Sequence, residues 1–130
     1  MDADSLTANS IERATVTVEI YSGRENPSWS LTAADKDAVV QRIADLIRAK
    51  STIDARPEHH LGYSGLTVQL TGKTGTIAVF VGGGVVTLGD GGRTLGLRDS
   101  GRALESWLAE TGAAELRPEV LAQIRGSFGK

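Results

Sequence analysis

The chain is predicted to fold as one α+β domain with an antiparallel meander sheet of about 4–5 strands and two or three helices, packed mainly on one face. Strand-like alternation is concentrated in the middle of the sequence, helical periodicity flanks it, and glycine-rich turns separate the apolar runs. The length of 130 residues suits a single domain, and no repeat or linker divides it. We expect a flexible N-terminal tail over 1–13 and one domain over 14–130.

The first strand is predicted over Thr15–Tyr21, where β-branched residues alternate strictly with the opposite face. Ser28–Leu31 alternates again, as a short strand or an extended lead-in to a helix. That helix is predicted over 33–49, because Thr32 and Asp35 form a near capping box and apolar residues follow on one helical face: Val39, Ile43, Leu46 and Ile47. The stretch 50–64 is then an irregular connector.

A meander of short strands is predicted after the connector. Leu66–Thr71 and Thr76–Val81 flank a glycine-bounded turn and indicate a hairpin, whose nearly continuous apolar second arm belongs at the centre of the sheet. Val85–Leu88 and Arg93–Leu97 continue the meander. Two helices close the chain: one is capped by Asp99 or Ser100, and the other begins at Pro118.

Composition and charge exclude several classes of protein. The chain is 40% hydrophobic and 23% charged, as globular domains are, and it has no cysteine for disulfides, thiolate metal sites or a nucleophile. The 14 basic and 16 acidic residues form no basic run, so we expect no nucleic acid as a partner. The sequence has no apolar run long enough to span a membrane and opens on polar Met1–Ser5, so we expect no membrane partner and a cytoplasmic location.

Glycine is the compositional outlier, at 16 residues of 130. Gly72–Thr74 resembles the end of a phosphate-binding loop, but Thr67 occupies the place of the first glycine and a strand follows instead of a helix. Ten of the 16 glycines lie between positions 62 and 92. They are therefore interpreted as turn residues, and no cofactor is expected.

The two histidines, His59 and His60, are the candidates for catalysis, as general bases. Adjacent side chains on an extended segment point to opposite sides, and no helical His-x-x-x-His spacing exists, so no metal site is expected. The sequence also lacks a nucleophile elbow. An enzyme is therefore the alternative interpretation and not the favoured one.

The polar turn from Tyr21 to Trp29 is the most promising binding region. An arginine can hold a carboxylate through two hydrogen bonds while an aromatic side chain forms a wall, and both residue types are favoured at binding hot spots. In the competing interpretation the turn is structural: its asparagine bonds the backbone, its arginine pairs with an acid and its tryptophan fills the core. The predicted ligand-binding residues are Arg24, Asn26, Trp29, Tyr21 and Tyr63.

Three functions follow from these observations. The favoured one is a small non-catalytic binding or accessory module that recognises a peptide, a protein or a small anionic ligand through the Tyr21–Trp29 turn. The alternative is a small enzyme with His59 or His60 as general base and Arg24 holding an anionic substrate. A third is a structural protein that self-assembles through sheet edges, because its late strands are unusually apolar; a homodimer and a monomer stay open.

Overall fold

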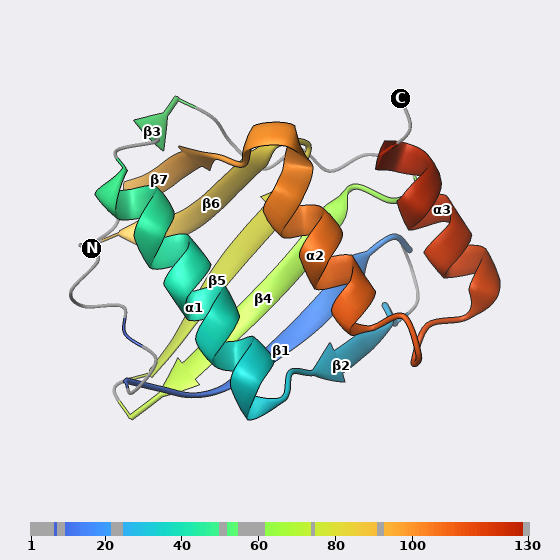
Figure 1. Ribbon diagram of the computed structural model, residues 1–130, viewed down its shortest axis with the longest axis horizontal. Coiled ribbons are helices and arrows are strands. Elements are labelled where there is room, and N and C mark those ends of the chain that lie inside the picture. The colour runs from blue at the N-terminus through green and yellow to red at the C-terminus, as the bar shows by residue number, and fades with distance from the viewer. Residues whose placement is uncertain are drawn as a thin grey trace.

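The computed structural model is an α+β fold, which confirms the predicted class (Figure 1). Its described part holds three α-helices and one open, seven-stranded antiparallel sheet. The structure describes residues 7, 10–21, 25–49, 52–54, 62–73, 75–90 and 93–128. For residues 90 and 93 it describes the backbone and not the side chain.

The sheet has the strand order β2-β1-β4-β5-β6-β7-β3, and every neighbouring pair is antiparallel. The predicted meander forms its centre, with the apolar arm of the hairpin as the middle strand. The first strand lies beside the hairpin, and two short strands occupy the edges. The strands are β1 (Ile11–Glu19), β2 (Ser28–Ser30), β3 (Thr52–Ile53), β4 (Gly65–Gly72), β5 (Gly75–Gly82), β6 (Val85–Asp90) and β7 (Arg93–Arg98).

The predicted count of 4–5 strands is too low. Ser28–Leu31, predicted as a short strand or an extended lead-in, contains β2, whereas the two residues of β3 are too few to show a period. β3 lies within the stretch that was expected to be an irregular connector. β1 also begins earlier than expected, since Ile11 is buried and Arg13 pairs with Thr71 of β4. Ile11–Arg13, assigned to the tail from the sequence, therefore belong to the sheet.

The first and the last helix begin at the residues predicted from Thr32 and Pro118, and the middle helix begins a few residues after the predicted cap, Asp99 or Ser100. α1 (Ala33–Arg48) starts after Thr32, whose Oγ1 accepts a hydrogen bond from the backbone N–H of Asp35 at 3.1 Å. α2 (Ala103–Thr111) follows a 3₁₀ turn, and the carboxylate of Asp99 accepts hydrogen bonds from two backbone N–H groups of its first turn. α3 (Pro118–Phe128) begins at the proline.

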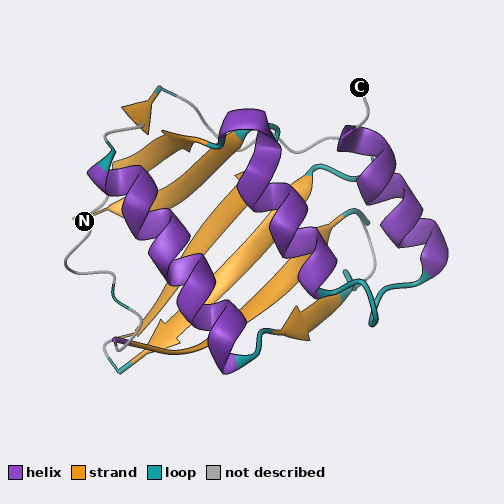
Figure 2. Cartoon of the chain, viewed as in Figure 1, coloured by secondary structure: helices purple, strands orange, loops and turns teal. Residues whose placement is uncertain are grey.

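The elements form two layers, with α1 and α2 lying across one face of the sheet and α3 at its side (Figure 2). The core lies between these layers and consists mainly of aliphatic side chains, among them Val16, Leu70, Ile43 and Leu108. No described helix covers the opposite face of the sheet. Within the described residues, no helix is both long enough and apolar enough to cross a membrane.

Trp29 ties the β2 edge of the sheet to the end of α2. The indole is buried, and its Nε1 donates a hydrogen bond to Oγ1 of Thr111 at 2.9 Å. Gly112 directly follows α2, and a Cβ at this position would overlap the Trp29 ring. The missing side chain at Gly112 therefore leaves the room into which the indole packs.

We predict that Gly112→Ala destabilises the fold by about 1–3 kcal/mol, because the added methyl group overpacks the indole. Gly126→Ala is the matched control. Gly126 lies exposed within α3 and a Cβ there meets nothing within 4 Å, so this substitution should stabilise the protein by about 0.5–1 kcal/mol. Urea unfolding of both variants measures the two effects. Equal shifts in the same direction would refute the role assigned to Gly112.

Candidate functional site

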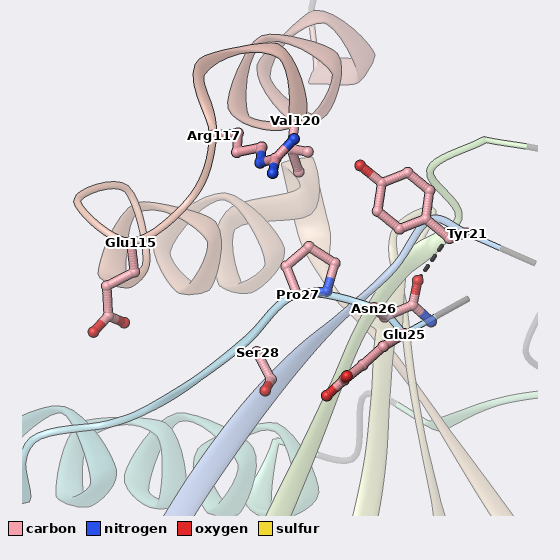
Figure 3. Close-up of a pocket in the computed structure, with 8 residues that line it drawn as sticks. All are labelled: Tyr21, Glu25, Asn26, Pro27, Ser28, Glu115, Arg117 and Val120. Atoms are coloured by element: carbon pink, nitrogen blue, oxygen red, sulfur yellow. Dashed lines mark hydrogen bonds between the residues drawn. The ribbon is translucent and has the colours of Figure 1, made fainter.

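An open cleft of about 460 Å³ lies between the segment that joins β1 to β2 and the start of α3 (Figure 3). One wall comes from the turn that the sequence singled out, and the other comes from residues near position 117. The lining consists of Tyr21, Glu25, Asn26, Pro27, Ser28, Glu115, Arg117 and Val120. Residues distant in the sequence thus meet at one edge of the sheet.

The side chain of Asn26 links the first wall of the cleft to the end of β1. Its Oδ1 accepts hydrogen bonds from the backbone N–H groups of Ile20 at 3.3 Å and Tyr21 at 2.7 Å. Its Nδ2 donates to Oε2 of Glu19 at 3.4 Å. Pro27 is fixed in turn, because its carbonyl accepts from the backbone N–H of Val18 at 2.9 Å. These bonds set the position of the wall before any ligand arrives.

The cleft combines an apolar surface with charges of both signs. Tyr21, Pro27 and Val120 supply the apolar part, and Figure 3 shows Arg117 and Val120 across the cleft from Pro27. The side chain of Arg117 is 81% exposed and lies 3.8 Å from the carboxylate of Glu119. The other lining charges are the exposed carboxylates of Glu25 and Glu115.

The structure separates the residues that were predicted to bind a ligand. Tyr21 and Asn26 line the cleft, whereas Trp29 is buried in the core. Tyr63 is also buried and belongs to a different cluster. Arg24, His59 and His60 lie outside the described residues.

That second cluster surrounds the carboxylate of Glu105, which is fully buried. Oε2 accepts from the Tyr63 hydroxyl at 2.5 Å and from Nη2 of Arg102 at 2.7 Å. Oε1 accepts from Nε of Arg102 at 2.9 Å and from the backbone N–H of Gly83 at 3.1 Å. Four donors thus satisfy one carboxylate, the arrangement that a buried charge requires.

The ionisation of this cluster reflects its burial. Burial, followed by the hydrogen bond to Glu105, raises the pKa of Tyr63 well above its usual value. The hydrogen bonds to Glu105 likewise raise the pKa of Arg102. The phenol therefore stays protonated and the guanidinium stays charged, which suits a structural role for the cluster.

Arg102 extends the cluster to the far end of α3. Its Nη1 donates to the backbone carbonyl of Ser127 at 2.7 Å, and its guanidinium lies 4.4 Å from the ring centroid of Phe128. Arg102 has a backbone φ of 54°, in the region that favours glycine. The strained backbone is thus compensated by contacts that hold the last turn of α3.

The sequence did not reveal the wall formed by Glu115, Arg117 and Val120. Its one local signal was Pro118, which marks the start of a helix but says nothing about what that helix faces. The Arg102–Glu105 pair has helical i, i+3 spacing, yet such pairs are usually exposed, so its burial was not foreseen. Among the described residues, no group of three or more acidic, histidine or cysteine side chains is arranged to hold a metal ion.

Comparison with models of protein families, with curated proteins and with solved structures found no significant match to this chain. The geometry of the cleft is therefore the basis of the function proposed below.

We predict that Tyr63→Phe costs about 1–3 kcal/mol at pH 7, because the buried Glu105 carboxylate loses a donor. The substitution should also change the pH dependence of stability. The pKa of Tyr63 is higher in the folded chain than its unfolded value of about 10, so unfolding releases a proton above that pH. The contribution of Tyr63 to stability is complete below about pH 10 and is lost as the pH rises further.

Urea unfolding between pH 8 and pH 11 should accordingly show a steeper alkaline loss of stability for the wild type than for Tyr63→Phe. Both proteins contain the same lysines and the same second tyrosine, so the difference between their slopes isolates Tyr63. Parallel pH profiles would contradict the buried, protonated phenol.

Proposed function

We propose that the protein is a non-catalytic binding module that takes a short peptide segment of a partner protein into the cleft beside β2. The observation that supports this most directly is the open cleft, which Tyr21 and residues 25–28 line on one side and the start of α3 lines on the other. The hydrogen bonds of Asn26 hold the backbone of Ile20 and Tyr21 in place, and a preformed surface loses less entropy on binding.

The charges of the cleft favour a peptide over a simple anion. Arg117 faces an acidic group on the ligand, whereas Glu25 and Glu115 favour a basic one. A peptide segment with one basic and one acidic side chain complements both signs, and its apolar side chain packs on Tyr21 and Pro27. The anionic ligand expected from the sequence depended on Arg24, which lies outside the described residues.

The two other functions remain separate proposals. The enzyme alternative depends on His59, His60 and Arg24, and no contact of the described residues favours it. Self-assembly through sheet edges is opposed by the edges themselves, since β2 and β3 are short and short edge strands limit pairing with other chains.

We predict that selection from a displayed library of random seven-residue peptides enriches sequences with a basic and an acidic residue at fixed spacing. An enriched peptide should bind at least about tenfold more weakly to Tyr21→Ala and to Arg117→Ala, because each substitution removes a contact of hot-spot type. Isothermal titration calorimetry with the synthetic peptide measures the two effects.

Arg13→Ala is the matched control, because Arg13 is an exposed arginine on β1 and outside the cleft lining. Its affinity for the peptide should equal that of the wild type. The proposal fails if the library yields no enriched sequence, or if enriched peptides bind the cleft variants as tightly as the wild type.

A further inference from the structure

The sheet face opposite the helices has an uncharged centre. Alternate residues of a strand point to the same face, so the side chains opposite the buried ones belong to this surface. On β4, β5 and β6 they are uncharged: Thr67, Gln69, Thr71, Thr76, Ala78, Phe80, Val85, Thr87 and Gly89. An uncharged centre within a charged rim is typical of protein interfaces.

Opposite charges lie on the two sides of this centre. Glu19 of β1 pairs with Gly65, and Arg98 of β7 pairs with Val85, which pairs with Gly82. Gly65 and Gly82 are adjacent, because Gly65 directly precedes Leu66, Gly82 directly follows Val81, and Leu66 pairs with Val81. Glu19 and Arg98 therefore occupy the two ends of one row across the sheet.

The positions of this acid and this base are symmetric about β5. β1 and β7 each lie two strands away from β5, about 10 Å on either side. Glu19 is oriented by a hydrogen bond from Oγ1 of Thr67 at 2.9 Å. Arg98 is exposed and has no acidic partner among the residues that the structure describes. A twofold axis parallel to β5 would place Glu19 of one copy against Arg98 of another, twice.

A hollow of about 280 Å³ lies beside β5 on the same face. Its lining includes Ala78, Thr87, Gly89 and Thr94. The side chain of Thr87 is buried, and its Oγ1 has no hydrogen-bond partner among the described residues, an unfavourable state for a buried hydroxyl. The hollow thus offers both space and an unsatisfied polar group.

The same twofold axis brings an exposed side chain to this hollow. Gln69 of β4 pairs with Ala78 of β5. Gly89 of β6 lies on the other side of Ala78, because Val79 and Leu88, the neighbouring residues in these two strands, pair with each other. Rotation about an axis along β5 exchanges the positions of β4 and β6. Gln69 of a second copy would therefore stand over Gly89, where its amide can donate and accept hydrogen bonds.

We propose that the protein forms a symmetric dimer through this face, in which Gln69 of each copy enters the hollow of the other and Glu19 pairs with Arg98. Sheets pack face to face about 10 Å apart, with their strands within about 30° of alignment. The side chains of Gln69, Glu19 and Arg98 are long enough to reach across this separation. The proposed dimer face does not include the lining of the peptide cleft, which lies near β2 and the start of α3, although Glu19 also accepts a hydrogen bond from Asn26 of that lining.

The dimer should be weak. Five strands and the rows from Glu19 to Thr15 cover roughly 20 Å by 15 Å, which is small for a stable protein interface. We therefore expect a dissociation constant in the micromolar range or above, and sedimentation velocity must cover concentrations from about 1 to 500 μM.

A charge exchange tests the arrangement. Glu19→Arg and Arg98→Glu should each raise the dissociation constant at least about tenfold, because each places like charges opposite one another. The double variant restores two opposite pairs and should return to within about threefold of the wild type. Circular dichroism confirms that each variant is folded, which matters for Glu19 because it also bonds Thr67 and Asn26.

Ala78→Arg gives an independent test at the centre of the face, where the exposed alanine can be replaced without disturbing the core. This variant should be monomeric at all concentrations. Its matched control, Ala122→Arg on the exposed side of α3, should dimerise like the wild type. A wild type that stays monomeric, a dimer that survives Ala78→Arg, or a double variant that fails to recover would each overturn the proposal.

Discussion

The buried carboxylate of Glu105 is the interaction on which the arrangement of the fold depends. It accepts hydrogen bonds from three separate parts of the chain: Tyr63 before β4, Gly83 between β5 and β6, and Arg102 before α2. A buried charge is costly unless it is fully paired, so the fold tolerates this acid only when all three parts are in place. The cluster thereby couples the sheet to the helical layer more specifically than aliphatic packing does.

Buried contacts of the interior hold the elements that line the cleft. Arg102 holds the last turn of α3 through Ser127, while Arg117, directly before this helix, and Val120 in its first turn line the cleft. On the opposite side, buried Trp29 anchors β2, which directly follows the lining residues 25–28. Both sides of the cleft are thus attached to elements that the interior of the protein holds.

The parts of the fold that were predictable from the sequence are those with local signals. Thr32 and the aliphatic period marked α1, and the glycine turns separated β4 to β7. β3 was missed because two residues cannot show alternation, and its pairing with β7 is decided by tertiary contact. The turn that contains Tyr21 and Asn26 was predicted to bind a ligand from its residue types, and both residues line the cleft. The Arg117 wall was not predicted, because only the folded chain brings α3 to the edge of the sheet.

The short edges of the sheet have a further consequence for how copies of this chain associate. β2 pairs with only three residues of β1, and β3 with only two of β7, so neither edge offers a long template for strand addition. A surface that binds a second copy of itself about a twofold axis is fully buried once two copies bind, whereas an open strand edge can add further chains indefinitely. The proposed dimer would therefore stop at two chains and would not extend into a fibre.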